Sequence, residues 1–325
     1  MSKNKLFINS IISLIVIGIC LVLFMQNSNG NLNFESLLIS ISNGWIYLLL
    51  ASILLIISVY LRSLRWKYLF TSNSSNSIQD LFSSQLVGYF INNIFPIRIG
   101  DFAKSYIVAK KTDNKTSYIL GSIIMERFLD TLMLFVFLMV TIWHYGTHYL
   151  GVNFSILNDI LFNPFFLCFL LFILFAYFQR WHIKFIPIKI QIALAEVWKG
   201  FIGIHSSGKG IVIFSSILIW LIYWANAFLI QMIFPSLGLS IIDCLLLLVV
   251  SSFIQFIPTG FGALGIFHLG IESVLSKLGV VHYHNFLIIL WFYSYFIYTS
   301  LGAYYFIKEG KFTFKNLYND LIKNH

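Results

Sequence analysis

The sequence carries little charge. Only 10% of its 325 residues are Asp, Glu, Lys or Arg, whereas a soluble domain carries roughly 25%. Hydrophobic residues make up 59% of the chain and the mean hydropathy is +0.86. Water cannot solvate that much apolar surface, so the composition excludes an ordinary soluble enzyme and indicates a lipid bilayer as the solvent.

The sequence also lacks recognisable catalytic and metal-binding patterns. The three cysteines, Cys20, Cys168 and Cys244, lie singly in apolar runs without metal or redox spacing. His144 and His148 are four residues apart but have no third ligand nearby. No nucleotide-binding loop, serine-hydrolase elbow or zinc-protease motif is present. We therefore expect no metal, no cofactor and no enzymatic activity.

Long apolar runs dominate what is present. A helical crossing needs roughly 20 apolar residues. The sequence predicts about eight crossings, at residues 6–25, 45–61, 118–144, 160–178, 211–234, 241–257, 265–281 and 285–307. The first run is too long for the apolar region of a secretory signal and is interpreted as a retained span. The expected fold is all-α: one polytopic membrane bundle over residues 1–325, with a core at 6–307 and a tail at 308–325.

Basic residues alternate between the connections. All but two of the 21 Lys and Arg lie in the N-terminus, region 62–117, region 179–210 or the tail. The loops 26–44, 145–159 and 235–240 contain none. Because Lys and Arg mark the cytoplasmic side, both termini are predicted to be cytoplasmic, in a multi-pass protein of the cytoplasmic (inner) membrane. The net charge of +9 is thus explained by basic residues in the cytoplasmic connections, which orient the protein in the membrane. No nucleic-acid partner is expected.

Two apolar segments are interrupted by Pro and Gly. Segment 81–97, which ends near Pro96, has basic residues on both sides. It is therefore predicted to enter and leave from the cytoplasmic face as a re-entrant hairpin. A second broken segment, at 256–270, contains Pro258, Gly260, Gly262 and Gly265. Paired interruptions in two halves of a chain point to a transporter binding site, although a structural kink is the alternative for each.

Ionisable residues inside apolar runs are costly and favour the bundle interior. Glu126 and Asp130 share a helix face, and Arg127 is expected to pair with Asp130. These three residues predict either a structural ion-pair lock or a role in substrate or proton movement. Likewise, His268 and Glu272 are one turn apart and are expected to hydrogen-bond, either as a structural pair or as a titrating site.

Two cytoplasmic segments suggest contact with the bilayer surface. Arg62, Arg65 and Trp66 end the second span, where such residues are typical interfacial anchors and where the arginines could contact lipid phosphate. Segment 183–204 is amphipathic and is interpreted as a helix in the interface plane or as an ordinary connecting helix.

Three blocks of the sequence together resemble a known family. The first block is Arg62-x-x-Arg65-Trp66. The second is residues 88–104, which include Asn92 and Asn93-x-x-Pro96-x-Arg98-x-Gly100-Asp101, and it is followed by Glu126-Arg127-x-x-Asp130. The third is Pro258-Thr-Gly260-Phe-Gly262-Ala-Leu-Gly265. The chain is similar to the lysylphosphatidylglycerol synthase transmembrane-region family, also called the flippase-like family, over roughly residues 6–307.

The resemblance implies a membrane bundle with re-entrant segments that moves lipid between leaflets. It implies that Asn93, Pro96, Arg98, Gly100, Asp101 and the Glu126–Asp130 group line or support the translocation region. Where the family usually has an acidic residue after the glycine block, this chain has His268, and Glu272 is the candidate replacement. The chain ends at His325 without a soluble aminoacyl-transferase domain, so we do not expect it to make lysyl-lipid alone.

Two functions are consistent with these observations. The first is a lipid flippase or transporter for a polar, glycosylated or aminoacylated lipid, with membrane lipids as its partners. The alternative is a non-catalytic membrane subunit that holds an enzyme of lipid or polysaccharide biosynthesis at the bilayer through loop 179–210. An intramembrane lipid-modifying enzyme that uses His268 and Glu272 is a third and weaker hypothesis, because the catalytic set is incomplete.

Overall fold

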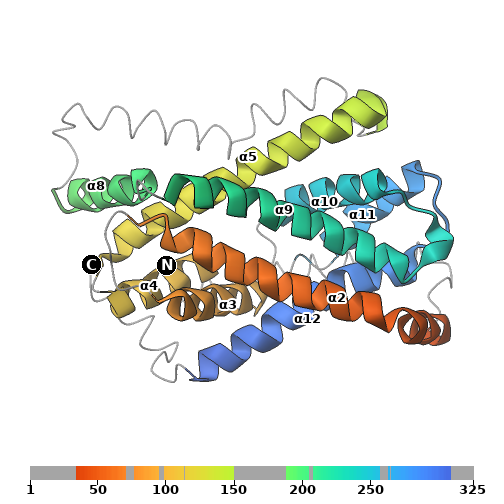
Figure 1. Ribbon diagram of the computed structural model, residues 1–325, viewed down its shortest axis with the longest axis horizontal. Coiled ribbons are helices and arrows are strands. Elements are labelled where there is room, and N and C mark those ends of the chain that lie inside the picture. The colour runs from red at the N-terminus through yellow and green to blue at the C-terminus, as the bar shows by residue number, and fades with distance from the viewer. Residues whose placement is uncertain are drawn as a thin grey trace, which may run out of the picture.

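The described part of the chain is entirely helical. The computed structural model describes residues 34–70, 77–94, 99–112, 114–149, 188–204, 208–256, 263 and 265–308. Within these ranges the helices are α2 (Phe34–Lys67), α3 (Ile78–Ile94), α4 (Gly100–Thr112), α5 (Thr116–Tyr149), α8 (Ile188–Ile202), α9 (Lys209–Met232), η2 (Pro235–Leu237), α10 (Ile241–Phe256), α11 (Ile266–Lys277) and α12 (His284–Lys308). Figure 1 shows them as an elongated bundle. The expected crossings 6–25 and 160–178 lie outside the described residues.

The long helices carry their apolar residues outward. In α2, α9 and α12, length and composition suffice to cross a membrane, and large apolar side chains such as Leu49, Phe214 and Phe296 are exposed on their surfaces. The charged side chains Arg62 and Glu126, by contrast, are buried. This arrangement is the reverse of a water-soluble protein and suits a lipid surround.

α3 and α4 form an antiparallel helical hairpin. Asp80 near the start of α3 pairs with Lys111 near the end of α4 at 3.1 Å, and Asn92 near the end of α3 bonds Gly100 at the start of α4. The Ser77 hydroxyl accepts the backbone N–H of Asp80 at 3.1 Å and so caps the N-terminus of α3. The segment expected to be re-entrant thus supplies one arm of a hairpin, and its residues 95–98, which include Pro96, lie outside the described residues.

A second hairpin is formed by α10 and α11. Ser240 and Asp243 form a reciprocal capping box at the start of α10. The two helices pack against each other at Ile254 and Gly270. At 16 and 12 residues they span only about 24 and 18 Å at 1.5 Å per residue. The runs at 241–257 and 265–281 are therefore the arms of a hairpin around the second broken segment, not separate full-length crossings.

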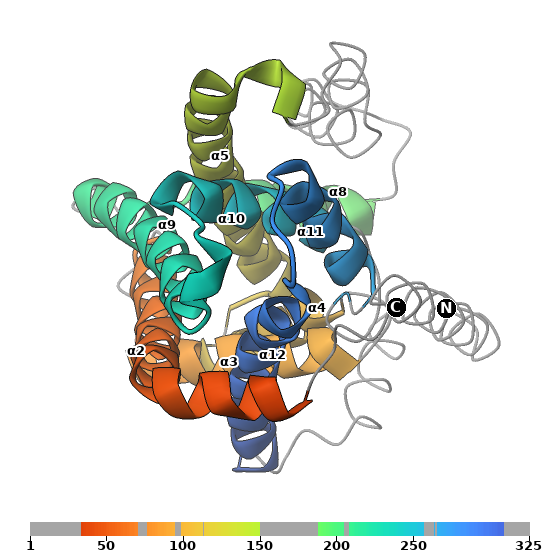
Figure 2. The same cartoon turned by 90° about the vertical axis from the view of Figure 1, so that its right-hand side faces the viewer.

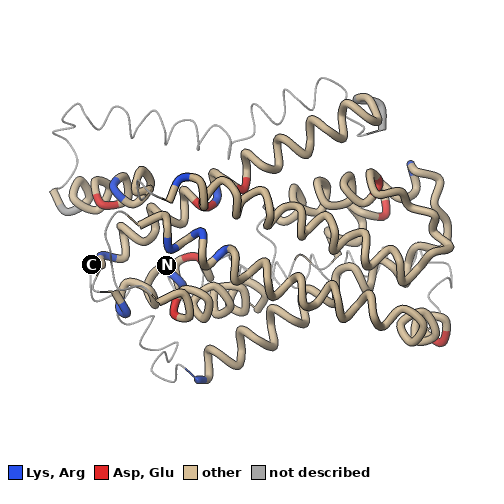
Figure 3. The backbone as a smooth tube through the Cα atoms, viewed as in Figure 1, with Lys and Arg blue, Asp and Glu red and all other residues tan. Residues whose placement is uncertain are grey.

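The two hairpins lie in opposite halves of the bundle. Figure 1 shows α3 and α4 at the left and α10 and α11 at the right, and Figure 2 shows the second hairpin in the half that faces the viewer. The Lys and Arg of the described residues gather mainly toward the end that holds α4 and α8 (Figure 3). Positive charge therefore collects on one side of the bundle, as the alternation in the sequence predicts.

Helix α8 packs tightly against α5 through two glycines. A Cβ added to Gly121 would lie 1.9 Å from the carbonyl oxygen of Val197, and one added to Gly200 would lie 1.9 Å from that of Tyr118. The first turns of α8 expose Ile188, Ile190 and Ile192. This apolar surface fits the predicted amphipathic helix at the membrane interface.

Candidate functional site

Arg62 joins α2 to the charged turn of α5. Its Nη1 lies 2.9 Å from Glu126 Oε1 and 2.8 Å from Asp130 Oδ2, and its Nε donates to the Tyr223 hydroxyl at 2.7 Å. Because Glu126 and Asp130 are one helical turn apart, both carboxylates face the same guanidinium. The sequence located the carboxylates correctly on one face, but it did not identify Arg62 as their partner.

Arg65 and Trp66 are also turned into the bundle. The Arg65 side chain is 0% exposed, and its Nη1 donates to Asp130 Oδ1 at 2.9 Å. Trp66 is buried, and its Nε1 donates to Ser122 at 2.9 Å. Arg62, Arg65 and Trp66 therefore lie inside the bundle and are not exposed anchors: the carboxylates of α5 hold both arginines there, and Arg62 faces the cavity described below. Contact of the arginines with lipid phosphate stays a prediction.

Lys104 and Gln85 complete the buried network from the first hairpin. Lys104 Nζ lies 3.3 Å from Glu126 Oε2 and 3.1 Å from Gln85 Oε1. Gln85 Nε2 in turn donates to Glu126 Oε2 at 3.2 Å. Neither residue was predicted as a site residue, although Lys104 follows Asp101 by three positions on the same helix face. That spacing, and its place at the end of the family-like block at residues 88–104, are the signals the sequence offered for it.

Arg127 pairs mainly with Asp101 of α4. Its Nη2 lies 3.0 Å from Asp101 Oδ1, whereas the expected contact with Asp130 measures 3.9 Å. The Arg127 side chain is 38% exposed, which makes it the most accessible of the cations in this cluster. The pair therefore lies at the edge of the network.

The two asparagines hold the inner end of the first hairpin. Asn92 Oδ1 accepts the backbone N–H of Gly100 at 2.7 Å, and a Cβ on Gly100 would lie only 2.0 Å from the carbonyl oxygen of Gly88. Asn93 Nδ2 donates to Thr299 of α12 at 2.9 Å. Gly100 is thus required for the close approach of α3 and α4. Pro96 and Arg98 lie outside the described residues.

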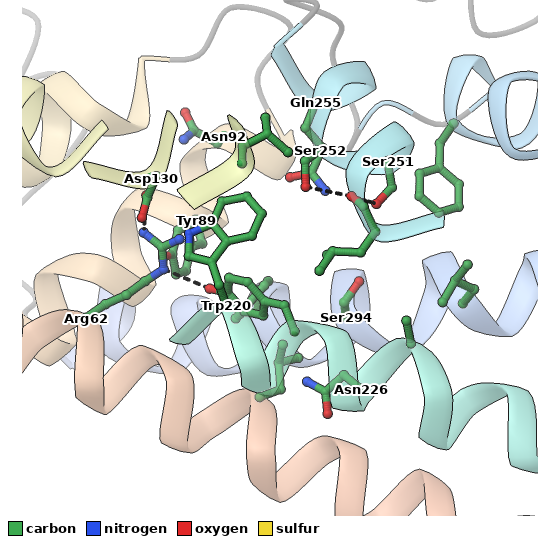
Figure 4. Close-up of a pocket in the computed structure, with 18 of the residues that line it drawn as sticks. Arg62, Tyr89, Asn92, Asp130, Trp220, Asn226, Ser251, Ser252, Gln255 and Ser294 are labelled. Atoms are coloured by element: carbon green, nitrogen blue, oxygen red, sulfur yellow. Dashed lines mark hydrogen bonds and ion pairs between the residues drawn. The ribbon is translucent and has the colours of Figure 1, made fainter. Parts of the chain in front are cut away.

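A cavity of about 310 Å³ lies between the inner ends of the hairpins. Its lining comes from the end of α3, the start of α4, the end of α10 and the start of α11, and from α2, α5, α9 and α12. Figure 4 shows Arg62 and Asp130 at one side and Ser251, Ser252 and Gln255 at the other. The helix ends that flank the two broken segments therefore converge on one cavity.

The second hairpin places fewer of its predicted site residues at the cavity. His268 and Glu272 are buried but are absent from the cavity lining. His268 packs beside the rings of Phe267 and Trp291, and Glu272 Oε1 accepts from the Tyr283 hydroxyl at 3.3 Å. Gly265 precedes α11 with φ of 88°, a conformation that favours glycine. Gly260 and Gly262 lie outside the described residues.

These features define an integral membrane protein: an α-helical bundle in which two short hairpins meet at a polar internal cavity. The sequence matches the family described as lysylphosphatidylglycerol synthase TM region over residues 10–302. The chain therefore belongs to that family. Comparison with curated proteins gave no significant match, and comparison with solved structures gave none either.

Proposed function

We propose that this protein moves a phosphate-bearing lipid between the two leaflets of the cytoplasmic membrane. The headgroup passes through the central cavity while the acyl chains remain in the bilayer. One observation carries the proposal: the cavity lies at the meeting point of two broken segments, and arginines from α2 and α5 line it. Such paired interruptions mark the substrate site of many transporters.

The charge balance beside the cavity favours an anion. The cluster contains four cations, Arg62, Arg65, Lys104 and Arg127, against three carboxylates, Asp101, Glu126 and Asp130. One positive charge is therefore left over in a cluster that is mostly buried. Arg127 lines the cavity, and its Nε has no hydrogen-bond partner. Guanidinium groups bind phosphate through two parallel hydrogen bonds, so Arg127 is the best candidate for the headgroup contact.

The two hairpins suggest how the cavity opens first to one leaflet and then to the other. The end bearing α4 and α8 is the cytoplasmic end by the positive-inside rule. A lipid headgroup would enter between the helices from one leaflet and leave toward the other as the hairpins shift. The Glu126, Arg127 and Asp130 turn would gate this step or couple it to protons. The sequence has no nucleotide-binding motif, so we expect transfer to be downhill or driven by the proton gradient or membrane potential.

The experiment is lipid transfer in liposomes that contain the purified full-length protein and trace acyl-labelled phospholipid. The matched variants are Arg127→Gln, at the cavity, and Lys67→Gln, which removes an exposed cation at the end of α2. We expect transfer by wild-type and Lys67→Gln protein, and at least about a tenfold loss in Arg127→Gln, because a charge-assisted hydrogen bond contributes roughly 1.5–3 kcal/mol. Equal rates in all three would refute the role of Arg127.

A cellular measurement separates transport from the scaffold hypothesis. Lipids of the outer leaflet are labelled with a membrane-impermeant reagent in cells with and without the gene. If the protein transports, one lipid falls in the outer leaflet while its total amount is unchanged. A fall in the total amount would instead favour a subunit that supports synthesis.

A further inference from the structure

We propose that the headgroup taken by this cavity is a phosphate joined to a neutral polyol, such as glycerol, inositol or a sugar. This inference rests on the transport function proposed above. It comes from a division within the cavity lining: the charged side chains come from α2, α4 and α5, and those from α9, α10 and α12 are uncharged. Two ends of different chemistry imply a ligand with two different parts.

The serines at the neutral end act as hydrogen-bond acceptors. Ser251 and Ser252 donate their hydroxyl protons to the carbonyl oxygen of Leu248 at 2.9 and 2.8 Å, and Ser294 donates to that of Trp291 at 3.1 Å. Each hydroxyl has one proton and two acceptor lone pairs. With the protons already used, the oxygen atoms can accept hydrogen bonds from a ligand.

Asn226 and Trp220 supply unused hydrogen-bonding capacity. Asn226 is 2% exposed, and neither its Nδ2 nor its Oδ1 has a hydrogen-bond partner. The Nε1 of Trp220 is also buried and unpaired. Both residues line the cavity. Buried polar atoms without partners are uncommon because each costs roughly 1–3 kcal/mol. A ligand with several hydroxyl groups would satisfy both the donors and the acceptors here.

The charges argue against a cationic headgroup. Among the described lining residues the carboxylates are Asp101 and Asp130, and arginines pair with both. The neutral end thus lacks a counter-ion for an ammonium group, and the excess positive charge of the cluster opposes one. A neutral polyol avoids this repulsion and still uses Asn226 and the serines.

The cavity size agrees with a headgroup alone. Its volume of about 310 Å³ lies near the lower limit of roughly 300–1,000 Å³ for small-molecule pockets. A phosphate and a polyol can share this space, whereas acyl chains must remain outside. The phosphate is placed at Arg62 and Arg127, and the polyol is placed beside Asn226.

The test compares four labelled lipids in liposomes with the full-length protein. Phosphatidylglycerol and phosphatidylinositol carry a polyol; phosphatidylethanolamine and lysyl-phosphatidylglycerol carry ammonium groups. We expect the first two to move at least about tenfold faster. A site built to hydrogen-bond hydroxyls strongly rejects phosphatidylethanolamine, which lacks them, and lysyl-phosphatidylglycerol brings ammonium groups to a site with excess positive charge. Equal or faster movement of the ammonium lipids overturns this inference but leaves the transport function standing. Absence of movement for all four, in protein that remains folded, overturns both.

Two substitutions at Asn226 refine the test. Asn226→Leu should slow the polyol lipids and leave the slow ammonium lipids unchanged, whereas Asn226→Asp should shift the preference toward ammonium headgroups. Binding of glycerol phosphate and phosphoethanolamine, followed by tryptophan fluorescence, gives a readout independent of transfer. An equal loss for every lipid in both variants, or unchanged preference in both, would mean that Asn226 is only structural and would overturn the assignment.

Discussion

Arg127 of α5 donates to Asp101 of α4 at 3.0 Å, so the first hairpin is tied to the charged helix at the edge of the cavity. Asp101 therefore limits how freely Arg127 can contact a headgroup. We expect Asp101→Asn to tighten the binding of glycerol phosphate by up to about tenfold, because the released guanidinium gains a charge-assisted bond. Titration calorimetry measures the affinity. Weaker or unchanged binding would show that Asp101 orients Arg127 and does not restrain it.

Arg65 is a structural part of the network and lies outside the cavity lining. Arg65→Met should lower the free energy of unfolding by about 3–5 kcal/mol, because it removes one partner from a buried ion pair and leaves Asp130 undercompensated. Thermal unfolding in detergent measures the effect. Lys67→Met, two residues away on an exposed position, should change stability by no more than about 0.5 kcal/mol. Similar stability of the two variants would contradict the structural role.

The hairpin of α3 and α4 depends on Gly100. A Cβ at this position would meet the Gly88 carbonyl oxygen at 2.0 Å and Asn92 Oδ1 at 2.6 Å. We expect Gly100→Ala to destabilise the protein by roughly 1–3 kcal/mol or more through overpacking. Gly210→Ala is the control, because a Cβ there has no neighbour within 4 Å. Thermal unfolding compares the stability of the two variants. A Gly100→Ala protein as stable as the wild type would disprove the close approach of α3 and α4.

The contact between α5 and α8 should weaken in acid. Lys115 donates to Glu196 at 3.0 Å, and this hydrogen bond lowers the pKa of Glu196 from its ordinary value of 4.5. Its stabilisation is therefore present above pH 4.5 and is lost as the pH falls through the lowered pKa. Lys115 is exposed, so the effect at neutral pH is at most about 1 kcal/mol. A double-mutant cycle of Glu196→Gln and Lys115→Gln should give coupling at pH 7 that vanishes in strong acid; constant coupling would refute the ionic origin.

The orientation predicts opposite labelling of two ends of the bundle. In a cysteine-free background, Lys199→Cys on α8 should react with an impermeant maleimide only when the reagent has access to the cytoplasmic side of the membrane. Ser236→Cys in η2 should react in intact cells, because that connection carries no Lys or Arg. Reversed labelling would place both termini outside.

Sequence reasoning located the long helices more reliably than the hairpin arms. The runs at 118–144, 211–234 and 285–307 match α5, α9 and α12 to within about five residues. The run at 45–61 misses the first eleven residues of α2, which are less apolar and are supported by a hydrogen bond from Asn285 to Ser36. Hydrophobicity also could not distinguish the arms α10 and α11 from full crossings, because buried and lipid-facing apolar runs look alike.

The candidate site was predictable only where its signal was local. Glu126 and Asp130 stand out because charge inside an apolar run is rare. Their partners Arg62 and Arg65 lie more than 60 positions earlier, and no local pattern indicates that pairing. Asn226 and Tyr223 lie in a helix whose polar residues carry no motif, so their position at the cavity required the tertiary structure.

The paired glycines between α5 and α8 have a mechanical consequence. Because backbone meets backbone at Gly121 and Gly200, neither helix can slide past the other without a steric clash. Gly121 precedes Glu126 by little more than one helical turn. Any displacement of α8 would therefore move the adjoining turn of α5 with it, just before the buried carboxylates of that helix.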